Sequence, residues 1–135
     1  MSWDVSVQRF SRGEYAEITE IPEDESCAPL GSRVEVQIAI SKFFPSTDWS
    51  DPAWGNYEST DGSIEFNLGS DEPNTGFMMH IRASATVVPS VVAMCIAEHW
   101  QALDCGSGEF LERSATPDAG LEQWIDYRKD VVGHA

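Results

Sequence analysis

The segment richest in side chains that could bind another molecule is Thr47-Asp48-Trp49-Ser50-Asp51-Pro52-Ala53-Trp54-Gly55. Tryptophan is enriched at the centres of protein interfaces, and carboxylates pair with the cationic groups of a partner. Asp48, Trp49, Asp51 and Trp54 therefore suit a cationic protein better than a small metabolite. The other interpretation is that both indole rings pack over one end of the core, with Asp51-Pro52 as a turn.

Other acidic segments could add charge around such a contact. Residues 13–31 include six acids and no Lys or Arg, and Pro22 and Pro29 prevent them from forming one helix. We predict an acidic loop there, either simply solvated or part of an interaction surface. The turn 69–74 is acidic as well. The candidate rim charges are Glu23, Asp24, Glu25, Asp71 and Glu72.

Catalytic and metal-binding patterns are missing from the sequence. His80, His99 and His134 are far apart and lack the His-x-x-x-His spacing of a metal site. Ser107 lacks the G-x-S-x-G elbow, and Cys105 follows an aspartate whose charge raises a thiol pKa. We predict no catalytic residues, no metal and no cofactor.

One carboxylate pair remains open. Glu58 and Glu65 lie on neighbouring predicted strands, where two carboxylates can share acid–base work. The turn at Ser70 lacks the spacing of a calcium loop.

Net charge excludes two classes of partner. The 135 residues hold 8 Lys+Arg against 23 Asp+Glu, a net charge of −15. Nucleic acids and anionic membranes are polyanions and need a basic surface, so we expect neither as a partner. The start of the chain lacks a signal-peptide pattern, and the cysteines are odd in number without C-x-x-C spacing, which favours a cytoplasmic location.

The elements that must position these residues follow from periodicity. Residues 2–10 alternate as a half-buried strand, and Ser32-Arg33-Val34-Glu35 is a capping box that begins a helix ending near Phe44. We expect a loop over 46–56. Strands are predicted at 57–60, 63–68, 76–82 and 101–104, with Asp61-Gly62 as the turn of a hairpin.

Two further helices complete the chain. One covers 84–100 and begins regularly at Val87 or Val88, because Pro89 is tolerated only in the first turn. Its predicted stripe comprises Val92, Cys95, Ile96 and His99. The last helix covers 117–132, behind a Thr116-Pro117-Asp118 start.

The order β-α-β-β-β-α-β-α predicts one α+β domain over 1–135. Such a chain most simply forms two layers, a mostly antiparallel sheet with its helices on one face. About 41% of the residues are apolar, enough for a core without metals or disulfides.

Four stretches carry a resemblance: S-D-P-A-W-G, S-I-E-F-N-L-G-S-D-E-P, M-M-H-I-R and W-Q-A-L-D-C-G-S-G-E-F-L. Together they fall within residues 50–111, and the chain resembles a family of small bacterial proteins without an assigned reaction. Small acidic single-domain proteins of this kind are also similar to immunity proteins that neutralise secreted antibacterial toxins. This second likeness is one of type and transfers no residue.

We therefore expect a non-enzymatic binding protein, most simply an immunity protein that occludes the active site of a toxin. One alternative is a small enzyme or ligand-binding domain with its site between sheet and helices. The other is a cytosolic accessory domain that forms oligomers such as a homodimer, with Trp124 and Ile125 of the last helix exposed.

Overall fold

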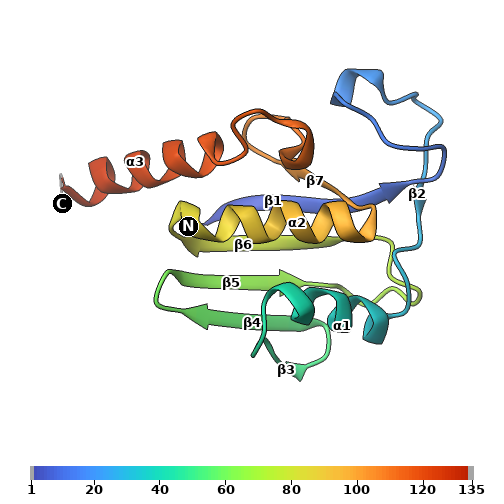
Figure 1. Ribbon diagram of the computed structural model, residues 1–135, viewed down its shortest axis with the longest axis horizontal. Helices are drawn as coiled ribbons and strands as arrows, with labels where there is room; N and C mark the ends of the chain where they lie inside the picture. The colour runs from blue at the N-terminus through green and yellow to red at the C-terminus, as the bar shows by residue number, and fades with distance from the viewer. Residues whose placement is uncertain (1, 134–135) are drawn as a thin grey trace.

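Seven strands form one antiparallel sheet in the computed structural model, which describes the backbone of residues 2–133 and the side chains of residues 2–129. The order is β2-β1-β6-β5-β4-β3, and β7 also pairs with β1 (Figure 1). The bounds are β1 Trp3–Phe10, β2 Cys27–Ala28, β3 Asp48–Asp51, β4 Trp54–Ser59, β5 Gly62–Asn67, β6 Phe77–Ala83 and β7 Gln101–Asp104.

Three helices accompany the sheet: α1 Arg33–Phe43, α2 Val88–Glu98 and α3 Ala119–Gly133. Figure 1 shows α1 and α2 side by side in front of the strands, while α3 extends away beyond the edge formed by β1 and β7. The predicted α+β architecture is confirmed.

Local signals set several boundaries. The capping box is formed, with Ser32 accepting from the Glu35 amide and the Glu35 carboxylate accepting from the Ser32 amide. The predicted hairpin between β4 and β5 is also formed. Gly62 has a φ of +130°, and a Cβ there would lie 2.3 Å from the Arg82 carbonyl oxygen, so only glycine fits this turn.

The core lies between α1, α2 and one face of the sheet. Side chains on that face alternate with those on the other, as the pleat of a strand requires. The fully buried members of the core include Val5, Ile64, Met79, Ile81, Ile40, Val91, Met94 and Cys95. Cys95 is thus a small residue of the core, and Cys27 and Cys105 are exposed free thiols.

The structure corrects the predicted loop over residues 46–56. Asp48–Asp51 forms β3, and β4 begins at Trp54, so the segment is mainly a tight hairpin. The sequence did not predict this strand for two reasons. Pro52, which occupies the turn, disfavours a strand assignment, and β3 is an edge strand with little alternation of apolar and polar residues. Residues 27–28 of the predicted acidic loop also form a short strand, and a 3-10 turn covers 18–20.

The predicted stripe of the second helix is correct for Cys95, which is buried, and for Val92, which packs against the core, but wrong for Ile96 and His99. Val88, Val91, Met94 and Cys95 are buried, whereas Ile96 is 60% exposed and His99 ends the helix in the left-handed conformation. A helix that is apolar on every side offers no contrast from which its buried face can be read.

The last helix begins two residues later than predicted and ends one residue later. Leu121 is fully buried, while Trp124 and Ile125 are half-buried against the core. No helix within the described residues is long and apolar enough to cross a membrane.

Candidate functional site

The hairpin of β3 and β4 separates the four residues predicted to bind a partner. Asp48 pairs with Asn56, and Asp51 pairs with Trp54. Paired residues on neighbouring strands direct their side chains to the same face of a sheet. Asp48, Asp51 and Trp54 therefore share the face opposite the helices.

Trp49 lies on the helix side of the same hairpin. Its indole Nε1 donates a hydrogen bond to Ser41 Oγ of α1 at 3.0 Å, and its ring centroid lies 6.3 Å from that of Phe66. Gly55 on β4 leaves room for the ring, because a Cβ there would lie 2.6 Å from Trp49 Cη2. These contacts give Trp49 the packing role that the sequence left as the other interpretation.

We name the surface opposite the helices the open face. Strand pairing across β3, β4, β5, β6 and β1 assembles it from positions far apart in the sequence. Its ionisable and aromatic members are Asp4, Asp48, Asp51, Trp54, Glu58, Glu65, His80 and Arg82.

An aspartate–histidine pair lies at the centre of the open face. His80 Nδ1 is 2.9 Å from Asp4 Oδ1, and Ser2 Oγ donates to the same oxygen at 2.5 Å. Burial alone raises the pKa of Asp4, but the hydrogen bonds from Ser2 and His80 outweigh it and lower the pKa. Asp4 is therefore ionised at neutral pH and orients the imidazole, as a carboxylate does in many acid–base sites.

Trp54 reaches His80 of this pair from β4, which is separated from β6 by β5. Its ring is stacked on the imidazole of His80, with centroids 5.8 Å apart and planes 21° from parallel. An indole fixed in this way presents a rigid, half-buried apolar surface surrounded by polar groups, which is the composition of many interface anchors.

The other charges on the open face differ in their pairing. Glu65 Oε1 accepts from Arg82 Nη1 at 3.0 Å, which neutralises part of the surface. Asp48, Asp51 and Glu58 are exposed, and none of them has an ion pair with a described residue. Hydrogen bonds from Ser50 lower the pKa of Asp48, so its negative charge persists into acidic solution.

The predicted rim charges lie in two other places. In the loop 13–31, Asp24 pairs with Arg12 at 2.8 Å and Glu25 accepts from the Tyr15 hydroxyl, while Glu23 is exposed. Asp24 and Glu25 are therefore bonded to residues at the start of the same loop.

The turn before β6 holds the remaining two rim charges. Glu72 caps α1, with its Oε2 accepting from the Arg33 amide at 3.2 Å, and Asp71 is exposed. Neither residue pairs across strands with the open face.

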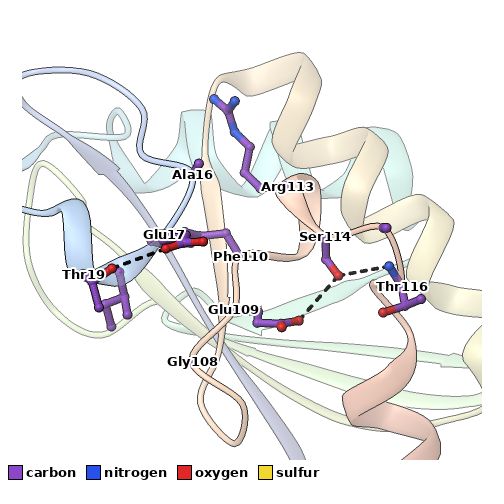
Figure 2. A pocket seen from close by; sticks show the side chains of 11 residues that line it. Ala16, Glu17, Thr19, Gly108, Glu109, Phe110, Arg113, Ser114 and Thr116 are labelled. Carbon is purple, nitrogen blue, oxygen red and sulfur yellow. Dashed lines mark hydrogen bonds between the residues drawn. The ribbon is translucent and has the colours of Figure 1, made fainter.

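A groove of about 490 Å³ separates the acidic loop from the segment that follows β7. Figure 2 shows Glu17, bonded to Thr19, on one side, and Glu109, bonded to Ser114, on the other. Arg113 also lines the groove, but its guanidinium donates to Glu14 at 2.6 Å. The acidic loop thus forms a wall of a concave surface, which its sequence did not indicate.

Glu112 lies between Phe110 and Arg113, two residues that line this groove. It is a partly buried acid, and its Oε2 atom has no hydrogen-bond partner among the described atoms. Its Oε1 accepts from the Ala102 amide at 2.7 Å. Desolvation raises the pKa of Glu112 to about 7, against the lowering effect of that hydrogen bond. Ionisation of Glu112 therefore lowers the free energy of unfolding.

Replacing Glu112 with glutamine should stabilise the protein in alkaline solution. A carboxyl pKa that is higher in the folded state adds stability below the unfolded value near 4.5, and this contribution is lost as pH rises through about 7. At pH 8.5 we expect a gain of about 1 kcal/mol in the free energy of unfolding, discounted for solvent screening, and at pH 4 no gain. Urea denaturation at both values measures it, and an equal gain at both would contradict the titration.

Metal binding finds no support in the described part of the chain, where no three His, Cys, Asp or Glu side chains converge. Glu58 and Glu65, the carboxylate pair considered for acid–base work, both lie on the open face. They are not directly paired across their strands, since Glu58 lies opposite Ser63 and Glu65 opposite Asn56.

No family model, no curated protein and no solved structure matches the chain.

The sequence did not indicate that His80 lies beside Trp54, or that Asp4 and Arg82 share a face of the sheet with it. The available signal was alternation, because each is a polar residue between apolar residues of a predicted strand. Their meeting depends on strand order and register, which alternation does not specify.

Proposed function

We propose that the chain is a non-enzymatic protein-binding module whose open face binds a cationic protein, and that it serves as a cytoplasmic immunity protein occluding the active site of an antibacterial toxin. The observation that carries this proposal is that Asp48, Asp51 and Glu58, none of which has an ion pair with a described residue, share one face of the sheet with the stacked Trp54. The net charge of −15 supports the same kind of partner.

The mechanism is steric and electrostatic. A toxin that acts on an anionic substrate has a basic cleft, and an acidic surface is attracted to that cleft over the range of a Debye length. On contact, Trp54 contributes apolar area while the surrounding carboxylates pair with lysine or arginine side chains. The toxin is blocked because its cleft is covered.

The small-enzyme alternative receives less support from the packing. The space between the sheet and helices α1 and α2, where that alternative puts the site, is filled by the apolar core. The Asp4–His80 pair lies on the opposite, open face, where it orients the ring on which Trp54 stacks. Binding uses that arrangement without requiring a nucleophile or a cofactor.

Identification of the partner comes first. The tagged protein, incubated at low salt with lysate of its own cells, should retain one basic protein that elutes as salt rises, because screening weakens steering. Mass spectrometry then identifies that protein. Retention of the same protein by a variant carrying Trp54→Ala with Asp48→Lys and Asp51→Lys would contradict the proposed surface.

Charge reversal then tests the surface quantitatively. With the purified partner, Asp48→Lys combined with Asp51→Lys should lower the association rate constant by at least about tenfold at low salt. Stopped-flow fluorescence measures the rate. The matched control, Glu20→Lys with Glu122→Lys, changes net charge equally at exposed positions away from the open face. An equal loss in both variants would assign the effect to overall charge and reject the open face.

A further inference from the structure

Helix α2 carries no charged residue before Glu98 at its end, although one of its sides is exposed. Residues 85–97, Ala-Thr-Val-Val-Pro-Ser-Val-Val-Ala-Met-Cys-Ile-Ala, contain no Asp, Glu, Lys, Arg or His in a chain that is 23% charged. Surface helices of monomeric proteins normally carry charged groups on the solvent side, and a helix that is apolar all round is normally buried. The exposed side of α2 therefore calls for a covering surface.

The exposed side forms a regular stripe. Val88, Val91 and Cys95 face the core, whereas Pro89, Ala93 and Ile96 are exposed and Val92 is partly buried at the margin of the core; we name these last four residues the outer stripe. Their spacing of i, i+3, i+4 and i+7 is the pattern by which one helix packs on another. Ile96 is 60% exposed, and the small Ala93 in the middle allows a second helix to approach closely.

The outer stripe is also hollowed. A groove of about 490 Å³ runs along it, with Ala85 and Pro117 at its margins and Asp118 as its one charged lining residue. The ridge of side chains on a facing helix can pack into such a groove.

We propose that the outer stripe of α2 is the interface of a two-fold symmetric homodimer, in which α2 of one copy packs on α2 of a second copy. A two-fold axis through the middle of the stripe brings Ile96 of each copy towards Pro89 of the other, so that every apolar position is covered. The inference is independent of the proposed function, because the open face lies on the opposite side of the sheet.

Charge selects this occupant over others. Two chains of net charge −15 repel each other, and the least repulsive approach brings together the surfaces with the fewest carboxylates, here a groove with Asp118 as its one charged lining residue. A strongly cationic partner would find only Asp118 as a counter-charge in the groove and would bury its other charges unpaired, which is costly. An anionic lipid surface repels the chain as a whole. A second copy is the one partner certain to offer a matching uncharged stripe.

Sedimentation equilibrium tests the proposal directly. The mass of the wild-type protein should rise from 14.9 kDa towards twice that value as concentration increases. Added NaCl should strengthen the association, because screening removes repulsion between the copies. Binding to a cationic partner has the opposite salt dependence, so failure of either proposal can be recognised separately.

Substitution locates the interface. Ile96→Glu, and separately Ala93→Glu, should weaken dimerisation at least about tenfold by placing like charges in the contact. Both side chains are exposed, and circular dichroism verifies that the variants fold. The control is Ile38→Glu at an equally exposed isoleucine of α1, 54% exposed beside Lys42, which should leave the mass unchanged. A wild-type mass of one chain at all concentrations up to about 0.5 mM overturns the proposal, as does dissociation by Ile38→Glu alone.

Discussion

Replacing Gly55 with alanine lowers the free energy of unfolding by about 2–3 kcal/mol, the cost of overpacking a filled site. The new Cβ would lie 2.6 Å from both Cη2 and Cζ3 of Trp49, closer than carbon atoms approach. Trp49 cannot retreat freely, because its Nε1 is bonded to Ser41 and its ring packs on Phe66. Urea denaturation followed by tryptophan fluorescence measures the loss.

A double-mutant cycle separates this clash from other causes. Combining Gly55→Ala with Trp49→Leu should recover at least about 1 kcal/mol relative to the sum of the two single effects, because the smaller side chain leaves room for the methyl group. The control is Gly69→Ala, where no atom lies within 4 Å and the cost is only that of a φ of +70°. Additivity of the two hairpin substitutions would show that Trp49 and Gly55 do not share this space.

Replacing Gly120 with alanine should weaken the attachment of α3, by about 2 kcal/mol on the same packing argument. A Cβ at Gly120 would lie 1.9 Å from Asp104 Oδ2 and 3.1 Å from Trp3 Nε1. Asp104 is 2% exposed, and its other oxygen accepts from the Gly106 amide at 2.8 Å, so this carboxylate is fixed. The clash must exceed the gain of about 1 kcal/mol that alanine gives inside a helix.

Hydrogen exchange distinguishes local detachment from global unfolding. Amides of α3 should lose protection in Gly120→Ala while those of β5 and β6 keep most of theirs, because α3 packs beside the sheet rather than within it. Gln123→Ala, at an exposed position of the same helix, is the control and should change little. A more stable Gly120→Ala variant would show that helix propensity outweighs the contact with Asp104.

Much of the architecture could be predicted from patterns within single segments. Alternation in residues 2–10, the capping box at Ser32 and the turn at Asp61-Gly62 each report local physics, and each element formed where expected. The edge strand β3 was missed, since four residues with two aspartates give no strand signal until pairing with β4 satisfies their backbone groups.

The candidate site was predictable only in part. Asp48, Asp51 and Trp54 were selected by residue type, and the structure places them together on one face. Asp4 and His80 are 76 positions apart, and only the pairing of β1 with β6 makes them neighbours. Ile96 and His99 were assigned to the buried side of α2 because most of the helix is apolar, so that its pattern alone could not distinguish buried from exposed positions.

The acidic edge strand has a consequence for the protein at high concentration. β3 is an edge strand that pairs only with β4, so the other side of its backbone is available to a strand from another molecule. Such pairing between molecules is the first step of amyloid-like growth. Asp48 and Asp51 place a negative charge at both ends of that four-residue strand. Because the hydrogen bonds from Ser50 lower the pKa of Asp48, this residue keeps its negative charge to a lower pH than an ordinary aspartate. We therefore expect these two charges to disfavour the pairing of β3 with a strand of another molecule.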